Sequence, residues 1–153
     1  MELSLGTLGS AASALALGLA VYALIAGIAG AVRRDARLQT SARLTAVAVF
    51  LATTTAVIVM QAALLTDDFS VKYVAEHSRI DSPIWVKVVT LWAALEGSVL
   101  LWAWLLTGYT AVLAVTTPNH ALRSWALVVM QGVQVFFLGV VALVANPFIV
   151  LAN

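Results

Sequence analysis

One stretch of the chain reads Leu91-Trp92-Ala93-Ala94-Leu95-Glu96-Gly97-Ser98-Val99-Leu100-Leu101-Trp102-Ala103-Trp104. It places an ionisable carboxylate, that of Glu96, inside an apolar run that is otherwise long enough to cross a bilayer. A charge at that depth costs about 3 kcal/mol on insertion scales, so such a residue normally faces protein or a cavity. Two interpretations follow: Glu96 is a protonated packing residue bonded to a neighbouring helix, or it takes part in handling a ligand or substrate.

The residues around Glu96 favour one continuous helix with a marked face. Trp85, Trp92 and Glu96 are seven and four residues apart, which places all three on one stripe of a helix. Gly97 and Ser98 follow directly, and both are small enough for another backbone or a flat ligand to come close.

The composition is that of an integral membrane protein. Of 153 residues, 63% are hydrophobic and 10% are charged, with a mean hydropathy of +1.03, which excludes an ordinary soluble domain. A net charge of +1 provides no basic surface for nucleic acid. Because the chain has no cysteine, disulfides, thiolate metal sites and haem attachment through a CxxCH motif are excluded within it.

Four apolar runs predict an all-α integral membrane protein with four transmembrane helices and no soluble domain. The predicted spans cover about residues 3–32, 44–65, 84–115 and 122–145. The loop between the first two spans carries the densest group of arginines, so the positive-inside rule places it in the cytoplasm. Both termini are therefore expected on the outside, N-out and C-out.

Residues 66–83 are predicted to form one structured outer loop between the second and third spans. Asp67 or Asp68 can cap a short helix there. Such a helix would carry three side chains on one face at a spacing of four, those of Phe69, Tyr73 and His77. Strand alternation fits part of this segment nearly as well.

Pro83 opens the third span, since proline is tolerated in a first helical turn. Trp85 and Lys87 come next, near the outer boundary, where an aromatic belt and a lysine that extends toward the headgroups are expected.

The two histidines, His77 and His120, are predicted to lie on opposite sides of the membrane. A hydrocarbon core of about 30 Å would separate them, so they could not both ligate one haem iron. The sequence also has no Ser/His/Asp set, no HExxH motif, no phosphate loop and no second intramembrane carboxylate. The residues by themselves predict no catalytic site, no metal site and no resident cofactor.

The fourth span carries Gln131 and Gln134 on one face. Counted from Ile84 for Glu96 and from Leu122 for Gln134, both side chains lie about 18 Å deep at the helical rise per residue. Adjacent antiparallel helices normally pack together, so we predict a hydrogen bond between a protonated Glu96 and Gln134.

Four motifs follow one another along the chain: DFSVKYVAEHS from Asp68 to Ser78, Pro83, LWAALEGSVLLW from Leu91 to Trp102, and Asn146-Pro147-Phe148. In this order and spacing they resemble the N-terminal region of the CcmF family of cytochrome c maturation haem lyases, together with its relative NrfE. The resemblance covers essentially the whole chain. The family-motif residues are Asp68, Phe69, Tyr73, His77, Pro83, Trp92, Glu96, Gly97, Ser98, Trp102, Asn146 and Pro147.

The resemblance implies a module or split subunit of the membrane haem lyase that attaches haem to apocytochrome c in the cell inner membrane. Full-length members of the family continue into a tryptophan-rich WWD segment and haem-ligating histidines, so this chain is not expected to be the complete catalyst. Haem would be handled by the complex rather than held in this chain. The implied partners are the rest of the lyase, a haem chaperone, other cytochrome c maturation subunits and apocytochrome c, with membrane lipid around them.

The resemblance also suggests which residues dock the haem-carrying partner or the rest of the lyase: Phe69, Tyr73, His77, Trp85, Trp92, Glu96 and Ser98. Where family members commonly read WGGHEGS, this chain reads WAALEGS from Trp92 to Ser98, and the loss of both glycines predicts a more regular helix. Family members also read HSN or NSN where this chain has HSR. Two alternatives stay open: a non-catalytic membrane scaffold subunit, and a proton or ion-path module in which Glu96 titrates.

Overall fold

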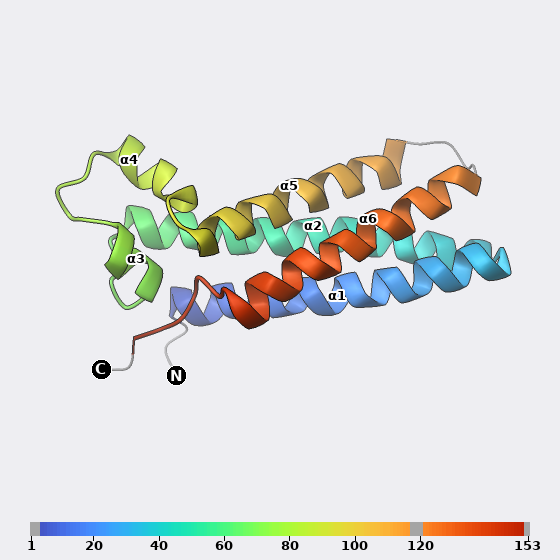
Figure 1. Ribbon diagram of the computed structural model, residues 1–153, viewed down its shortest axis with the longest axis horizontal. Coiled ribbons are helices and arrows are strands. Elements are labelled where there is room, and N and C mark those ends of the chain that lie inside the picture. Colours follow the sequence, from blue (N-terminus) through green and yellow to red (C-terminus); the bar gives the residue numbers. More distant parts are fainter. Residues whose placement is uncertain (1–3, 117–120, 152–153) are drawn as a thin grey trace.

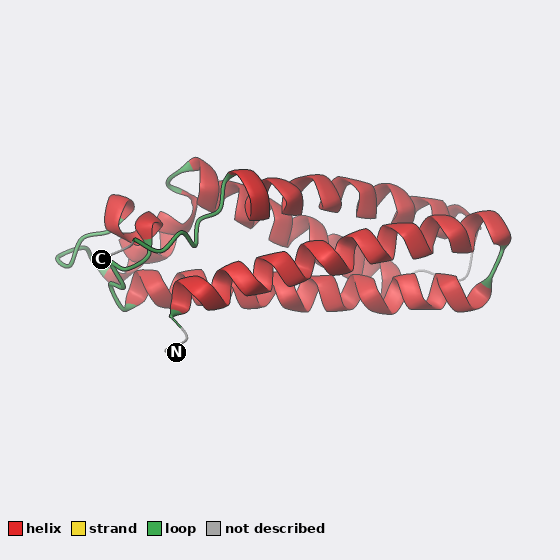
Figure 2. Cartoon of the chain, turned by 90° about the horizontal axis from the view of Figure 1, so that it is seen from below, coloured by secondary structure: helices red, strands yellow, loops and turns green. Residues whose placement is uncertain are grey.

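The computed structural model describes residues 4–116 and 121–151, and these residues form an elongated bundle of helices (Figures 1 and 2). The four long helices are α1 (Leu5–Arg33), α2 (Ala36–Leu65), α5 (Leu95–Thr116) and α6 (Ala121–Gly139), the last continued by a π-helical turn, η2 (Val140–Val144). Within the described residues these are the helices long and apolar enough to cross a membrane. The prediction of an all-α fold with four long apolar helices is confirmed.

Shorter elements gather at one end of the bundle. They are α3 (Lys72–His77), α4 (Ile84–Val89) and a single 3₁₀ turn, η1 (Thr90–Trp92). The described part of the chain contains no β-strand, only an isolated antiparallel bridge between Val71 and Val150.

The turn between α1 and α2 is very short because both helix ends are capped locally. Arg34 takes a left-handed conformation with φ 54°, and its N–H donates to the Gly30 carbonyl. The Asp35 carboxylate then accepts the N–H of Arg37 at 2.8 Å and so caps the start of α2. A Cβ at Gly30 would lie 2.9 Å from the Gln39 nitrogen, so the close crossing of the two helices requires glycine there.

The long helices form a ring in which α1 contacts α2 and α6, and α5 contacts α2 and α6. The α1–α2 contact is the most extensive of these. Small side chains make it possible, because they let two backbones approach closely in lipid. The buried residues of α1 are all small: Gly6, Gly9, Ser13, Ala16, Ala20, Ala23, Ala26, Gly27 and Gly30.

The two ends of the bundle differ in content (Figure 1). We call one the loop end: it carries α3, α4, the start of α1 and the C-terminal segment 145–151. We call the other the arginine end, because it carries the α1–α2 turn and the start of α6, with Arg33, Arg34, Arg37, Arg43 and Arg123.

The third predicted span is wrong in one respect, since residues 84–115 do not form one helix. The backbone unwinds at Ala93 and Ala94, between η1 and α5. With 22 residues, α5 alone is about 33 Å long, which suffices for a core of about 30 Å. Trp85, Trp92 and Glu96 therefore lie on three separate elements and share no helical stripe. The more regular helix expected from the missing glycines is not found.

Helix α1, and α6 together with η2, lie within a few residues of the ranges 3–32 and 122–145, whereas α2 begins at Ala36 rather than near residue 44. Much of the arginine-rich loop is therefore the first two turns of α2. His120 lies outside the described residues.

Candidate functional site

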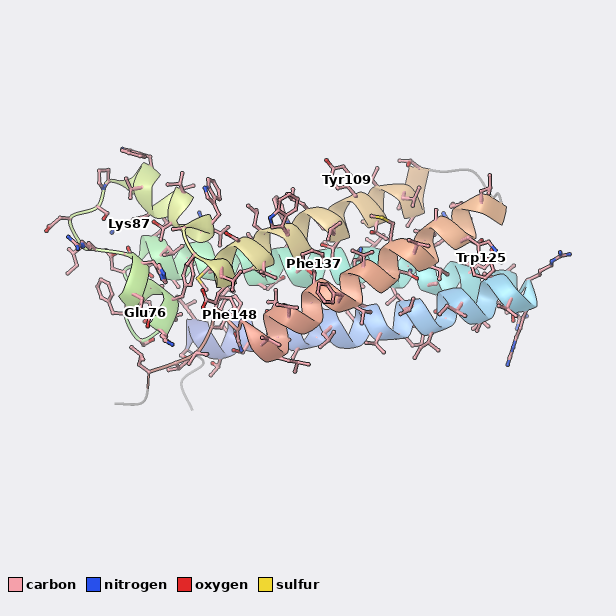
Figure 3. All side chains as sticks on the ribbon, viewed as in Figure 1. Glu76, Lys87, Tyr109, Trp125, Phe137 and Phe148 are labelled. Carbon is pink, nitrogen blue, oxygen red and sulfur yellow. The ribbon has the colours of Figure 1, made fainter. Side chains whose placement is uncertain are left out.

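Three segments far apart in the sequence meet at the loop end: α3, the unwound stretch before α5, and the C-terminal segment. Figure 3 shows Phe148 of the C-terminal segment lying between the helices at this end, while Tyr109 projects away from them. We call this meeting place the loop-end junction. Most of the motif residues singled out in the sequence lie in it.

Asp68 caps a turn and not a helix. Its Oδ1 accepts the N–H of Ser70 at 3.2 Å and the hydroxyl of Ser70 at 2.6 Å. The preceding residue, Asp67, takes a left-handed conformation with φ 53°. Because the chain is held in this turn, α3 begins only at Lys72, and Phe69 lies outside it with 37% of its surface exposed. The predicted helix starting near Phe69 is therefore wrong in its first turn.

Tyr73 connects α3 to the unwound stretch. Its ring is buried, and its hydroxyl lies 2.8 Å from the Thr90 carbonyl oxygen and 3.1 Å from that of Leu91. Burial raises the pKa of the Tyr73 phenol; the Ala94 N–H opposes this rise, and the charge of Glu96 adds to it. The phenol therefore stays protonated and serves as a hydrogen-bond donor to the broken helix.

Side chains also satisfy two further carbonyls near the break. The Ser98 hydroxyl donates to the Trp92 carbonyl at 3.1 Å, and Gln61 of α2 donates to the Val88 carbonyl at 3.4 Å. A non-helical segment in an apolar region is tolerated only where its polar groups find such partners. These donors explain why the helix can break here without a glycine in the break itself.

Gly97 is required by the same arrangement. A Cβ at this position would overlap the Leu91 carbonyl oxygen and the Tyr73 hydroxyl. The Tyr73, Gly97 and Ser98 positions are thus explained by the backbone geometry of the break.

His77 stacks on Tyr73, with ring centroids 4.6 Å apart and ring planes at 28°. Its Nδ1 lies 3.0 Å from the Tyr73 carbonyl oxygen. Because a carbonyl only accepts hydrogen bonds, this nitrogen carries a proton. The side chain is exposed at the surface of the loop end.

The C-terminal motif fastens the end of the described chain to the junction. Asn146 accepts the N–H of Phe148 at 2.9 Å, which forms a tight turn around the buried Pro147. The Phe148 ring is 1% exposed and packs so closely on Gly9 of α1 that a Cβ there would overlap it.

The segment after Phe148 pairs with the turn before α3. The Lys72 N–H donates to the Ile149 carbonyl at 2.8 Å, and the Leu151 N–H donates to the Ser70 carbonyl at 2.9 Å. The DFSVKY motif is thus hydrogen-bonded to the residues that directly follow the NPF motif.

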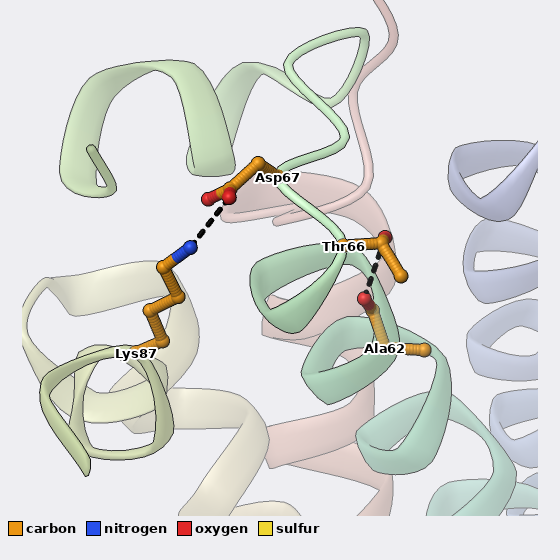
Figure 4. Close-up of polar contacts among 4 residues, drawn as sticks. All are labelled: Ala62, Thr66, Asp67 and Lys87. Atoms are coloured by element: carbon orange, nitrogen blue, oxygen red, sulfur yellow. Dashed lines mark hydrogen bonds and ion pairs between the residues drawn. The ribbon is translucent and has the colours of Figure 1, made fainter. Parts of the chain in front are cut away.

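Lys87 does not extend toward the headgroups as predicted. It turns inward from α4, is 6% exposed, and places its Nζ 2.5 Å from Oδ2 of Asp67 (Figure 4). The apolar side chains of α4 point outward instead, and Trp85 is 69% exposed. Sequence reasoning missed this ion pair, although an aspartate and a lysine at the two ends of one loop could have indicated it.

The predicted Glu96–Gln134 hydrogen bond is wrong. Gln134 donates to the Leu106 carbonyl at 3.2 Å, and Gln131 donates to the Ala42 carbonyl at 3.3 Å. Glu96 lies in the first turn of α5, partly buried, and forms no hydrogen bond or ion pair with any described residue. The depth count failed because it assumed an unbroken helix from Ile84.

Among the described residues, no three His, Asp or Glu side chains are grouped so that they could hold a metal ion.

Comparison with family models gives no match. Comparison with the sequences of individual proteins gives several matches. The cytochrome c-type biogenesis protein CcmF of Escherichia coli is 36% identical over 143 residues, which are 92% of this chain and 22% of that protein. CycK of Bradyrhizobium diazoefficiens, also a cytochrome c-type biogenesis protein, is 33% identical over 95% of this chain and 22% of its own length.

A solved structure shows that the similarity extends to the fold. The cytochrome c haem lyase CcmF matches 100% of this chain at 38% identity with a TM-score of 0.93. This chain is homologous to part of CcmF. It spans about a quarter or less of the length of the CcmF proteins it matches, since it covers 26% of the solved chain and 22% of the E. coli protein.

The motifs that predicted the CcmF resemblance come together only in part. Asp68, Tyr73, Gly97, Ser98 and Asn146 take part in the loop-end junction through the contacts described above. The side chains of three others do not bond within it: Pro83 precedes α4, Trp92 is 49% exposed, and Trp102 is 58% exposed on the outward face of α5.

Proposed function

We propose that this chain is the N-terminal module, or a separately encoded subunit, of a membrane haem lyase that joins haem to the thiols of apocytochrome c. The observation that supports this most strongly is the match to the solved CcmF haem lyase over the full length of the chain. The chain would act together with the rest of the lyase, a haem chaperone, other cytochrome c maturation subunits and apocytochrome c.

In this proposal haem is a substrate handled by the complex, and this chain supplies no axial ligand pair. His77 lies exposed at the loop end, and its ring is held by stacking on Tyr73. The purified chain alone is expected to bind no stoichiometric low-spin haem. A bis-histidine absorption spectrum that disappeared in either His77→Ala or His120→Ala would contradict this.

We propose that the loop end faces the extracytoplasmic side of the cell inner membrane. The basic residues support this: five arginines lie at the arginine end, against Lys72, Arg79 and Lys87 at the loop end, and Lys87 is paired with Asp67. A periplasm-specific reporter fused at the C-terminus should be active, and the same reporter at Gln39 should be inactive. The reverse pattern would overturn the orientation.

The loop end would then provide a platform for the haem-carrying partner. Its exposed side chains include Phe69, His77, Trp85 and Trp92, which combine aromatic surface with one imidazole. Beneath them, Tyr73 and Ser98 hold the backbone in place. The docking role is therefore proposed for the exposed group, with Tyr73 and Ser98 as its support.

The test is a chimera in which this chain replaces the matching segment of E. coli CcmF in a strain that lacks its own copy. Haem covalently attached to a c-type cytochrome, measured by haem staining of a denaturing gel, should be restored by the chimera and not by the remainder alone. A chimera that accumulates in the membrane without attaching haem would overturn the proposal.

One observation favours the alternative that the chain is a scaffold and does not dock the haem-carrying partner. Tyr73, Gly97 and Ser98 all stabilise or accommodate the backbone of the break. The chimera separates the two roles. Docking through the platform predicts that His77→Ala with Trp85→Ala lowers haem attachment while the protein still accumulates. A scaffold predicts normal attachment for this variant.

A further inference from the structure

One side of α5 carries a continuous stripe of side chains that face away from the bundle. Its members alternate at spacings of three and four residues: Leu95, Ser98, Trp102, Leu105, Tyr109 and Val112. Tyr109 and Leu95 are each 69% exposed, and Trp102 is 58% exposed. Residues at this spacing stay on one side of a slightly coiled helix, so a second helix could lie along the whole stripe.

Two hollows border this stripe, one after the other along α5. One, of about 390 Å³, lies between α2 and α5 and is lined by residues including Phe50, Trp104 and Gly108. The other, of about 370 Å³, is lined by Trp92, Ser98, Leu101, Trp102 and Leu105. Leu105 lines both, so the stripe and the hollows form one indented surface that could receive the side chains of a neighbouring helix.

Two hydrogen-bond donors on the stripe find no partner among the described residues, the indole N–H of Trp102 and the hydroxyl of Tyr109. Trp102 is seven residues from the start of α5 and Tyr109 seven from its end, so each lies about 10 Å inside the helix. Donors inside a span usually find a protein partner, because hydrocarbon offers none.

The other aromatic donors within the spans show what is usual in this chain. Tyr22 bonds to Ser41 at 2.8 Å, and Trp104 donates to Thr54 at 2.9 Å. Trp125 lies near the start of α6, where an interfacial aromatic residue is expected. Apart from Tyr22, the large exposed side chains of α1 are aliphatic and suit lipid, Leu15 and Ile25 among them.

We propose that the α5 stripe is the surface on which an apolar transmembrane helix from the rest of the haem lyase packs, with hydrogen-bond acceptors opposite Trp102 and Tyr109. This inference rests on the proposed function. The CcmF proteins are about four times longer than the segment that this chain matches, so the larger part of the lyase must pack against some face of the bundle. The α5 stripe combines indentation with donors that a protein helix could satisfy and lipid tails could not.

The experiment uses the absence of cysteine in this chain. The full chain is produced in E. coli together with the part of CcmF outside its match, which carries an affinity tag. Leu105→Cys and Tyr109→Cys are labelled with a benzophenone maleimide in membranes and irradiated, and Leu15→Cys and Ile25→Cys on α1 are the matched controls. An adduct with the mass of the tagged remainder is expected from the α5 positions and not from the α1 positions.

Each other outcome has a definite meaning. If the remainder fails to co-purify with the unmodified chain, both the proposed function and the stripe proposal fail. If it co-purifies but the α5 positions give adducts only with lipid or with a second copy of the chain, the stripe proposal alone is overturned. Equal adducts from α1 and α5 also overturn it.

A second measurement tests the two donors without changing the shape of the stripe much. Tyr109→Phe removes only the hydroxyl and should weaken retention of the remainder about threefold, which is typical of one hydrogen bond between membrane helices. Tyr22→Phe is the control and should leave retention unchanged, because its hydroxyl bonds within the chain. Equal retention by both variants would remove Tyr109 from the proposed contact.

Discussion

The loop-end junction and the α1–α2 hairpin satisfy their backbone polar groups by different means. Away from the helix ends, the backbone of the hairpin bonds within its own helices, and small residues such as Ala16 and Ala20 only have to let the two helices approach. At the junction the helix is broken, and single side chains such as Tyr73 and Ser98 bond to the released carbonyls. Apart from Gly30 beside the turn, the hairpin contact therefore needs only small residues, whereas the junction requires particular ones.

Gly97 should show the difference most strongly. Gly97→Ala would place a methyl group against the Leu91 carbonyl and the Tyr73 hydroxyl, so we expect a loss of about 3 kcal/mol in the free energy of unfolding. Gly18→Ala is the control, because a Cβ there meets nothing within 4 Å. It should be neutral or stabilise α1 by up to about 1 kcal/mol. Unfolding of the purified chain in detergent measures both, and similar values would remove the contrast between the regions.

Substitution of Lys87 tests the contribution of the Lys87–Asp67 ion pair to the stability of the loop end. Lys87→Met leaves the Asp67 carboxylate without its cation, and since Asp67 retains 22% exposure we expect a loss of about 2 kcal/mol. The Lys72–Glu76 pair on α3 is the matched control, with side chains 48% and 55% exposed. Lys72→Met should cost less than about 0.5 kcal/mol. If Asp67→Asn restored nothing in the Lys87→Met background, the stability of the pair would not come from its charges.

Tyr73→Phe should cost about 1.5 kcal/mol, because two buried carbonyls lose their donor while the ring keeps its place. Tyr22→Phe, on the hairpin side, should cost less, since its hydroxyl lies at an exposed position. Unfolding by heat or by denaturing detergent measures both variants. If both unfold at the same midpoint as the parent chain, the junction does not depend on the Tyr73 hydroxyl.

The same residue predicts a dependence on pH. The pKa of Tyr73 is raised in the folded chain, so its contribution is fully present below the ordinary tyrosine pKa of about 10. Above that value the unfolded chain loses the phenolic proton first, and the stability that this proton carries falls as the pH rises. The parent chain should therefore lose stability relative to Tyr73→Phe in alkaline solution, and a constant difference across this range would contradict the assignment.

Hydropathy predicted the four long helices because each needs only a run of apolar residues of the right length. The break before α5 was missed because its causes lie elsewhere in the chain. Tyr73, 17 residues before Thr90, supplies the donor, and Gly97 supplies the space. Because the break was not predicted, Glu96 was expected in the middle of a span, whereas it lies in the first turn of α5. The same error led to the wrong hydrogen-bond partner, Gln134.

The pairing of the C-terminal segment with α3 could not be predicted either, since periodicity describes only neighbours along the chain. The motifs predicted the relationship to CcmF correctly, whereas helical periodicity and depth counting predicted the wrong contacts. The order of DFSVKYVAEHS, EGS and NPF along the chain indicates CcmF without any knowledge of their contacts. The contacts then showed that much of this signature stabilises an irregular backbone, as Phe148 on Gly9 does.

Glu96 gives the smallest expected change in stability and the sharpest separation of roles. It lies in the junction but forms no bond with a described residue, unlike Tyr73 beside it. Glu96→Gln keeps the shape, so the free energy of unfolding should change by less than about 0.5 kcal/mol. Glu76→Gln, on the exposed face of α3, is the control for loss of a negative charge at the same end. The E. coli chimera carrying each variant supplies the functional measurement. If only Glu96→Gln abolishes haem attachment while the protein accumulates normally, its carboxylate is needed for function, and it is the one junction residue among those tested here whose role is not to hold the backbone. Full activity of both variants would make Glu96 dispensable and would leave the exposed platform as the functional part of the loop end.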